Sequence, residues 1–225
     1  MENRDNLMQQ LVFKFPFKTK YFEQDFFVSK NNFSAYKLIE SWPSWPSKWL
    51  NVFGDSGSGK THLSKILEKK IGKVKIVEAK EVDNNLIDII QKFECLIIDN
   101  YKNNIEEKLF YSLLNESKQL ENYIMINSLK PLKNFSYALS DLMSRIESFL
   151  FIGIDLPTDD LLQVLITKSF SDKQVELDPK VSDYIIKNVE RSYDKIFRFL
   201  KNVDELSLSS GKSININLIK KVLNK

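Results

Sequence analysis

The fold is decided by one stretch, Gly54-Asp55-Ser56-Gly57-Ser58-Gly59-Lys60-Thr61, which fits the pattern G-x-x-x-x-G-K-[ST] without a substitution. Glycines let successive backbone N–H groups curl around phosphate oxygens, while the lysine reaches the terminal phosphates and the threonine hydroxyl can bind Mg²⁺. A Gly/Ser-rich turn could carry the same string. The flanking pattern favours the phosphate loop, because residues 48–53 are typical of a strand and residues 61–71 of a helix. His62, the only histidine, is counted with the nucleotide contacts, although packing or loop support is favoured over catalysis.

A second half of the nucleotide site is expected at Asp99, which ends an apolar run thirty-nine residues after Lys60. A buried parallel strand ending here would expose its carboxylate beside the phosphate loop, where it could position Mg²⁺ directly or through water. Taken singly, an aspartate in a strand-end turn is an equally good interpretation. Paired with the matched loop, the pattern favours Thr61 and Asp99 as the metal ligands.

The residues that follow the strands modify this expectation. Many ATPases of this architecture place a second acid after the first, whereas this chain has Asn100, which can hydrogen-bond but cannot accept a proton. We therefore expect weak intrinsic hydrolysis. Asn127 and Ser128 end a later strand and could sense the γ-phosphate, with a simple turn-forming role as the equal alternative.

Length and composition exclude several classes of protein. A chain of 225 residues with 43% hydrophobic and 28% charged residues suits one α/β core with a small appended domain. The net charge of +3 is too mild to indicate nucleic-acid binding, so any DNA contact is expected to be indirect. Cys95 is alone in an apolar run, which indicates a buried strand position and no disulfide framework. Without a long apolar run or a signal-peptide core, we expect a cytoplasmic protein.

The order of expected elements defines the fold class. Strands and helices alternate through the first part, which predicts a parallel sheet with helices on both faces. After Pro157 only helical patterns remain, which predicts a small all-helical domain. Strands are expected over 48–53, 74–79, 95–99, 123–127 and 149–154, and helices over 32–41, 61–71, 84–93, 105–120, 140–147, 159–170, 179–190, 193–206 and 216–223, with a loop over 207–212.

Three motifs and the helical tail together resemble the AAA+ domain of the DnaA family of bacterial replication initiators. The motifs are G-S-G-K-T-H-L, L-I-I-D-N and D-L-M-S-R-I, the last over residues 141–146, and the similarity spans roughly residues 20–225. The resemblance implies an α/β AAA+ P-loop NTPase fold with a five-stranded parallel sheet, a small all-α lid domain, and ADP or ATP with Mg²⁺ as ligands. It also implies that Phe27, Val28 and Asn32 lie where relatives cover the adenine.

The third motif is similar to the segment in which this family carries an arginine finger, and Arg145 is the matching position. A guanidinium supplied to a neighbouring subunit's nucleotide neutralises transition-state charge. Without the family context, an arginine in a local salt bridge would be the better interpretation.

We expect the chain to end with the lid at Lys225, without the helix-turn-helix domain of the initiators, and this layout is similar to the Hda branch of the family. Hda proteins bridge DnaA to the DNA polymerase III sliding clamp and promote hydrolysis of DnaA-bound ATP, which prevents re-initiation. The resemblance implies a clamp-binding peptide and linker over 1–19, a nucleotide-binding domain over 20–156 and a lid over 157–225. It also implies a location near the bacterial nucleoid, with homodimer formation left open. The peptide residues that resemble the Q-L-x-[LF] motif, with an edge strand as the alternative, are Gln10, Leu11, Phe13 and Phe15.

One departure from the family bears on nucleotide preference. The position of the sensor 2 arginine falls on Asp194, which would repel the γ-phosphate, although Arg191 or Lys195 could substitute after a register change. We expect a weakened preference for ATP over ADP. Two rival functions remain: an autonomous DnaA-type ATPase or helicase loader acting on single-stranded DNA, and a small-molecule phosphotransferase.

Overall fold

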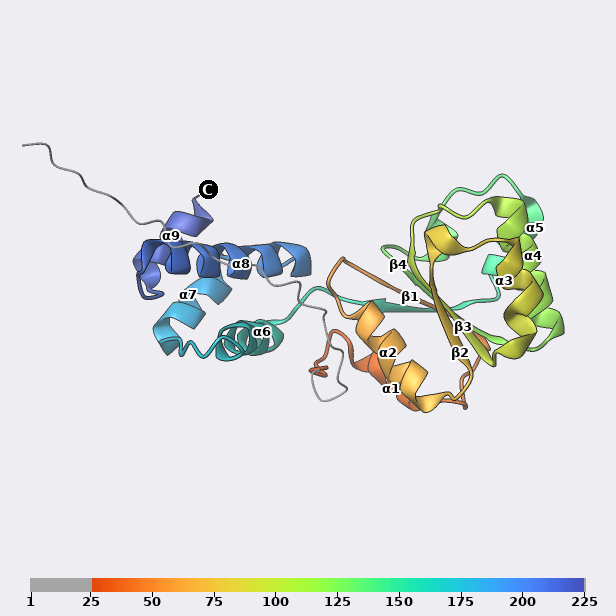
Figure 1. Ribbon diagram of the computed structural model, residues 1–225, viewed down its shortest axis with the longest axis horizontal. Helices are drawn as coiled ribbons and strands as arrows, with labels where there is room; N and C mark the ends of the chain where they lie inside the picture. Colours follow the sequence, from red (N-terminus) through yellow and green to blue (C-terminus); the bar gives the residue numbers. More distant parts are fainter. Residues whose placement is uncertain (1–25, 225) are drawn as a thin grey trace, which may run out of the picture. The chain divides into compact units, whose positions relative to one another are not determined.

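The computed structural model describes residues 26–224. The peptide predicted to bind the sliding clamp therefore lies outside the described residues. The described chain divides into two compact units, one that ends at Thr158 and one that begins at Asp159 (Figure 1). We call them the α/β unit and the lid unit.

The α/β unit is built on a parallel sheet with the strand order β2-β3-β4-β1-β5. Leu50 of β1 lies opposite Leu150 of β5, and Ile98 of β3 lies opposite Ile126 of β4. The β3–β4 register shifts between Ile98 and Tyr101, at the end of β3 that carries Asp99 and Asn100. The five strands are β1 (Trp49–Gly54), β2 (Val74–Glu78), β3 (Cys95–Tyr101), β4 (Tyr123–Ser128) and β5 (Leu150–Ile154). The prediction of a five-stranded parallel sheet is confirmed.

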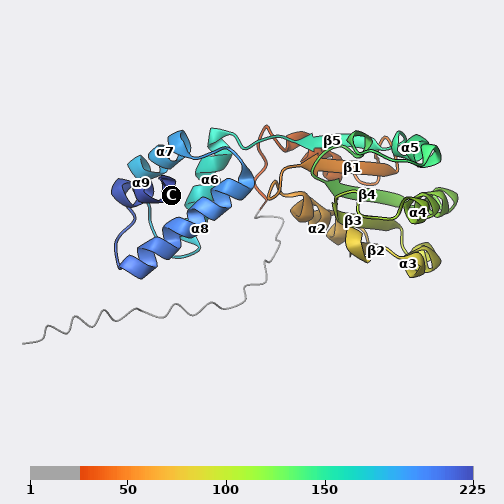
Figure 2. The same cartoon turned by 90° about the horizontal axis from the view of Figure 1, so that it is seen from above.

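Helices cover both faces of this sheet (Figures 1 and 2). Successive side chains of β3 enter different layers: Leu96 and Ile98 pack on one face and Cys95 and Ile97 on the other, as the period of two requires. One face carries α1 (Phe33–Glu40) and α2 (Lys60–Lys70), and the other carries α3 (Asn84–Ile89), α4 (Glu107–Gln119) and α5 (Ser140–Ile146). The prediction of a doubly covered sheet is confirmed, and Cys95 is fully buried as expected.

Several element boundaries differ from the sequence prediction. The helix expected over 84–93 ends as an α-helix at Ile89 and continues as a 3₁₀ turn, η3 (Ile90–Lys92). Phe93 is already extended, and the N–H of Glu94 donates to the Lys73 carbonyl at 2.8 Å, which starts the strand. Tertiary pairing therefore ends this helix earlier than its apolar pattern predicts. Two further 3₁₀ turns are η2 (Ala79–Glu81) and η4 (Leu132–Asn134).

The lid unit is all-helical, as predicted, with its own apolar core. Its helices are α6 (Asp159–Ser171), α7 (Pro179–Asn188), α8 (Tyr193–Ser210) and α9 (Ile216–Leu223). The start of α7 shows ordinary helix capping. The side chain of the N-cap residue Asp178 accepts from the Lys180 N–H at 2.8 Å, and Pro179 is the first residue of the helix. The loop expected over 207–212 is largely wrong, because α8 continues to Ser210 and ends where Gly211 takes φ +62°.

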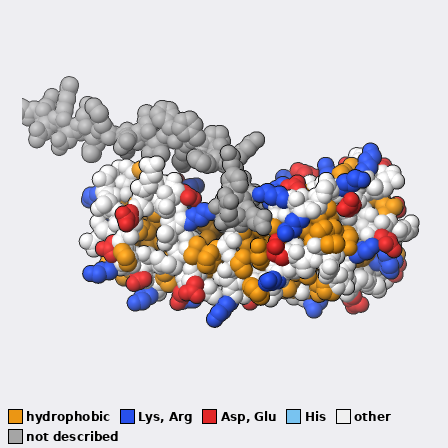
Figure 3. All heavy atoms as spheres, turned by 90° about the horizontal axis from the view of Figure 1, so that it is seen from below, with side chains coloured by type: hydrophobic (Ala, Val, Ile, Leu, Met, Phe, Trp, Pro, Cys, Tyr) orange, Lys and Arg blue, Asp and Glu red, His pale blue; other side chains and the backbone are white. Residues whose placement is uncertain are grey.

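The described surface carries mixed charge. On the face drawn in Figure 3, acidic and basic side chains are interspersed with apolar ones over both units. Within residues 26–224, no helix combines the length and apolarity that a membrane span requires.

Candidate nucleotide site

The predicted phosphate loop connects β1 to α2 and depends on glycine at two positions. A Cβ at Gly54 would lie 2.7 Å from the carbonyl oxygen of Ile154 on the neighbouring strand. Gly59 has φ +98°, and a Cβ there would lie 2.9 Å from the ring of Phe26. Because a side chain at either position would clash, the glycines are required by the packing of the loop as well as by its curvature.

Lys60 begins α2, and its side chain folds back over the loop. The Nζ donates to the carbonyl oxygens of Gly54 and Asp55, each at 2.7 Å. Burial lowers the pKa of Lys60 to about 8, although the charges of Asp99 and Asp55 oppose that shift. The ammonium is thus partly desolvated at a helix N-terminus, where a phosphate would add negative charge and favour its protonated form.

Asp99 is the centre of a buried hydrogen-bond network that joins three elements. Its Oδ2 accepts from the Thr61 hydroxyl at 2.7 Å, and its Oδ1 accepts from Asn127 Nδ2 at 3.0 Å. The same Nδ2 donates to the hydroxyl of Ser64 at 2.7 Å. The structure therefore brings the predicted residues Thr61, Asp99 and Asn127 together, and it adds Ser64, which the sequence analysis missed.

The donor set beside the loop suits Mg²⁺ held jointly with phosphates. Thr61 Oγ1 and the Asp99 carboxylate are hard oxygen ligands, and the Oδ1 of Asn127 is a buried acceptor without a hydrogen-bond partner in residues 26–224. The same residues include no cluster of three His, Cys, Asp or Glu that could hold a metal alone. The Thr61 and Asp99 oxygens fit Mg²⁺, which keeps several waters and is bound through one or two protein ligands plus substrate phosphates.

Asn100 directs its side chain to the neighbouring strand. Its backbone has φ +56°, which asparagine tolerates better than most residues, and its N–H donates to Asp99 Oδ1 at 2.9 Å. The Asn100 Nδ2 lies 3.1 and 2.9 Å from the two carboxylate oxygens of Glu78. Glu78 stands opposite Asp99 in the β2–β3 register. Sequence reasoning missed Glu78, whose only signal was an acid at the end of an adjacent strand.

The residues predicted near the adenine form a turn before α1. Phe27 is exposed and Val28 is half-buried, whereas Asn32 is buried. The amide of Asn32 shapes the turn: Nδ2 donates to the Phe27 carbonyl and Oδ1 accepts from the Ser29 N–H, both at 2.9 Å. Asn32 is thus held by the local backbone.

Phe26 was missed by the sequence analysis and contacts the site more directly. Its ring meets the ring of His62 edge-to-face, with centroids 5.2 Å apart, and stacks on Tyr36 at 5.8 Å. His62 therefore packs beside the loop, in the aromatic cluster that also covers Gly59.

Arg145 lies in the last turn of α5, away from the phosphate loop. Its Nε donates to Asn115 Oδ1 of α4 at 2.7 Å, and within residues 26–224 the structure records no ion pair for its guanidinium. The segment after α5 leads into the start of β5, and the Ser148 carbonyl accepts from Ser47, just before β1. Arg145 is thus at the amino edge of the sheet, where β1 and β5 begin, whereas the phosphate loop is at the carboxyl edge, where β1 ends.

The lid residues considered for sensor 2 are engaged in ion pairs within the lid unit. Arg191 lies 2.6 Å from Asp159, and Asp194 pairs with Arg198 at 2.9 Å. Arg191 and Asp194 are therefore also compatible with ordinary surface salt bridges, which contribute little to stability.

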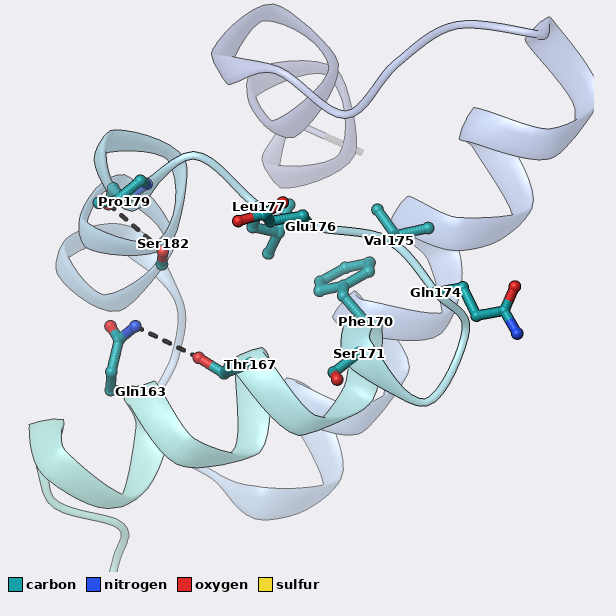
Figure 4. Close-up of a pocket in the computed structure, with 10 residues that line it drawn as sticks. All are labelled: Gln163, Thr167, Phe170, Ser171, Gln174, Val175, Glu176, Leu177, Pro179 and Ser182. Atoms are coloured by element: carbon teal, nitrogen blue, oxygen red, sulfur yellow. Dashed lines mark hydrogen bonds between the residues drawn. The ribbon is translucent and has the colours of Figure 1, made fainter.

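A cavity of about 500 Å³ opens in the lid unit, between α6 and α7. Figure 4 shows the ring of Phe170 facing this space, with polar side chains of both helices around it. It contains none of the predicted site residues and is lined by Gln163, Thr167, Phe170, Ser171, Gln174, Val175, Glu176, Leu177, Pro179 and Ser182.

The strand order and the helical lid give the fold of AAA+ proteins of the DnaA and RuvB type. Domain III of the Thermotoga maritima replication initiation protein DnaA superposes with a TM-score of 0.73 at 17% identity, over 93% of this chain and 98% of that one. AMPPCP-bound DnaA from Aquifex aeolicus gives 0.67 at 20% identity, over 86% and 68%. The Thermotoga maritima RuvB branch migration motor gives 0.60 at 20% identity, over 78% and 60%.

Sequence comparison narrows the class. The family described as Hda, lid domain, matches residues 159–223. The chromosomal replication initiator DnaA of Buchnera aphidicola subsp. Baizongia pistaciae is 27% identical, over 98% of this chain and 54% of that protein. An uncharacterized protein of Haemophilus influenzae is 22% identical, over 89% and 92%. The chain spans about half the length of the first DnaA relatives it matches. Residues 159–223 therefore match an Hda lid domain, and the chain as a whole is similar to DnaA proteins.

Proposed function

We propose that this protein regulates chromosomal replication initiation by stimulating hydrolysis of ATP bound to DnaA, which prevents re-initiation. It would bind ADP or ATP with Mg²⁺ in its own phosphate loop and dock on the DNA polymerase III sliding clamp. The DnaA-type fold and the Hda lid domain support the replication context. The finer activity is supported by the position of Arg145.

The observation that carries the proposal is the separation of Arg145 from Lys60. Arg145 is at the amino edge of the sheet, and Lys60 is at the carboxyl edge, a strand length of roughly 15–20 Å away. The helices that carry them also cover opposite faces. A guanidinium placed there cannot meet a phosphate in its own loop, so its charge is available to a nucleotide on a neighbouring subunit.

The protein's own nucleotide would act mainly as a conformational clamp. Lys60 and the loop N–H groups would hold the phosphates, and Mg²⁺ bound by Thr61 and Asp99 would neutralise phosphate charge. Asn100 offers no proton acceptor beside Asp99, so turnover in this site would be weak. ADP should then stabilise the protein at least as well as ATP, and a clearly tighter, Mg²⁺-dependent ATP site would contradict this.

Clamp docking rests on the sequence alone. Gln10 would hydrogen-bond at the rim of a clamp pocket, while Leu11, Phe13 and Phe15 would fill its apolar groove. Contact with DNA would be indirect, through the clamp, and a homodimer remains compatible with the proposal. The protein would act at the nucleoid in the cytoplasm.

The test measures hydrolysis of ATP prebound to DnaA, with DNA-loaded clamp and either wild-type protein or the Arg145→Ala variant. Stimulation by the wild type that disappears in Arg145→Ala, with clamp and nucleotide binding retained, is expected. A wild type that binds clamp and nucleotide but does not stimulate would overturn the proposal.

One observation favours a second candidate, an autonomous ATPase. Glu78 places a carboxylate beside Asn100, at the carboxyl edge where a second acid would act. If this candidate is correct, steady-state ATP turnover by the protein alone should be stimulated by single-stranded DNA and fall at least about a hundredfold in Glu78→Gln. Turnover that is absent, or unchanged in Glu78→Gln, removes it.

A further inference from the structure

We propose that Asn115 of α4 is the positioning residue for Arg145, which holds the guanidinium so that its two terminal nitrogens face a partner's nucleotide. The inference rests on the trans-acting role proposed above. It concerns an amide on another helix, thirty residues away in sequence, which no motif indicates.

The contact is set by two helices whose packing is fixed. α5 is anchored by Leu142 and Ile146, which are buried in the same apolar cluster as Leu114 of α4. Asn115 follows Leu114 directly and is half-buried, so its amide meets the side chain of Arg145 at the edge of this cluster. A hydrogen bond of 2.7 Å between rigid elements fixes the orientation of the guanidinium plane better than a contact with a loop would.

The choice of donor atom leaves the useful part of the guanidinium available. Arginine has five N–H donors, and the bond to Asn115 uses only the one on Nε. The two terminal nitrogens keep the parallel N–H groups that bind phosphate oxygens in a bidentate manner. A side chain held in this way loses less conformational entropy when the nucleotide binds.

The chemistry of the acceptor also preserves the positive charge. An amide oxygen accepts the hydrogen bond without neutralising the guanidinium, whereas a carboxylate at the same place would form a charged pair with it. Within residues 26–224 no ion pair is recorded for Arg145. Asn115 therefore orients the guanidinium while its charge remains available.

The alternative is that the bond only ties α4 to α5, and Asn115→Asp and Asn115→Leu together separate the two roles. The substitution keeps the shape and the acceptor and adds a negative charge, so it should leave the packing intact or make it slightly more stable. The tie between the helices would then be kept, whereas the stimulated rate would fall because the carboxylate neutralises Arg145. Asn115→Leu removes the acceptor without adding charge, so it shows whether the rate depends on the amide itself.

The experiment measures single-turnover hydrolysis of ATP prebound to DnaA over a range of concentrations of the full-length protein, with DNA-loaded clamp. We expect Asn115→Asp to lower the maximal stimulated rate at least tenfold and Asn115→Leu, which removes the acceptor, to lower it about tenfold. The half-saturating concentration and the melting temperature should stay close to wild type. Gln119→Glu, the same change one turn later on an exposed position of α4, should stimulate normally.

The outcomes distinguish the positioning role of Asn115 from the proposed role of Arg145. Stimulation that is lost in Arg145→Ala but retained in both Asn115 variants would overturn the positioning role and leave the proposed function standing. Stimulation that persists in Arg145→Ala would overturn both. If an Asn115 variant has a lowered melting temperature, and its loss of rate is matched by an equal rise in the half-saturating concentration, Asn115 is structural and the inference is wrong.

Discussion

At the carboxyl edge of the sheet, Lys60 and Asp99 are buried among several hydrogen-bond partners. At the amino edge Arg145 is half-buried, and the amide of Asn115 is the one hydrogen-bond partner of its side chain in residues 26–224. The buried network at the carboxyl edge is suited to holding a charged ligand, because its groups are oriented and partly desolvated in advance. The incompletely paired guanidinium at the amino edge is suited to contacting a ligand held elsewhere. Under the proposed function, the two ends of the same strands would separate nucleotide binding from activation.

The largest expected effect comes from substituting Arg145 at the amino edge. Arg145→Ala should lower the stimulated hydrolysis of DnaA-bound ATP by roughly 10³-fold, the range found for arginine fingers. Arg145→Lys should recover only part of this rate, because it restores the charge without the planar fork. Quenched-flow measurement of phosphate release checks both variants. Full activity of Arg145→Ala would place the activating group elsewhere.

The next largest effect comes from substituting Lys60 at the carboxyl edge. Lys60→Ala should weaken binding of ADP at least about thirtyfold, because a buried charged partner of the phosphates is lost. Lys65→Ala on the same helix removes only an exposed pair with Glu68 and should change affinity less than threefold. Fluorescent-nucleotide titration measures both. Arg145→Ala should bind like wild type, and weakening in that variant as well would show that the two edges are not separate.

A change of pH tests the carboxyl edge separately, because Lys60 there has a lowered pKa. The pKa of Lys60 is lowered by burial to about 8, from an ordinary 10.5, and bound phosphates should raise it again. Nucleotide affinity should therefore be level below pH 8 and fall by up to roughly tenfold per unit above it, as binding takes up a proton. For the same reason the free energy of unfolding of the nucleotide-free protein should rise between about pH 8 and 10.5.

Calorimetry in two buffers of different ionisation enthalpy detects the proton uptake at pH 8.5. Lys60→Arg supplies the control, because arginine stays protonated and should give a level profile over this range. Affinity that falls only below pH 8, or that stays level to pH 9.5 in the wild type, would contradict the assignment to Lys60.

The smallest effect concerns the contribution of the hydrogen-bond network around Asp99 to the stability of the protein. Asn127→Ala leaves Asp99 and Ser64 each without one buried partner and should lower the free energy of unfolding by about 1–3 kcal/mol. Asn188→Ala removes an exposed amide of the lid and should cost less than about 0.5 kcal/mol. Urea unfolding of both variants makes the comparison, and equal costs would mean that the Asn127 network is not coupled to the fold.

Much of the architecture could be predicted from local sequence patterns. The loop from Gly54 to Thr61 and the strand predicted to end at Asp99 are short motifs that belong to one type of nucleotide site. The phosphate loop, its neighbouring Asp99 and the parallel sheet were therefore all expected. Helix ends were less accurate. The last turn of α8, residues 207–210, is rich in serine and looks like a loop, yet the helix continues until Gly211 provides the left-handed end.

The missed features are pairings between distant residues. Glu78 meets Asn100 because of the strand register, Ser64 meets Asn127 because α2 crosses β4, and Asn115 meets Arg145 because α4 packs on α5. A single sequence carries no signal for such pairs, since each residue type is common at its own position. The roles assigned to the site residues and to the clamp-binding peptide stay predictions.

The central claim is that Arg145 acts on a nucleotide in another subunit, and labelling each nucleotide in turn tests it most directly. ATP with a radioactive γ-phosphate is prebound either to DnaA or to this protein, the two are mixed with DNA-loaded clamp, and phosphate release is followed through one turnover. The account predicts rapid, Arg145-dependent release from labelled DnaA and slow release, insensitive to Arg145→Ala, from this protein. Rapid release from the label on this protein that is lost in Arg145→Ala, with none from DnaA, would contradict it.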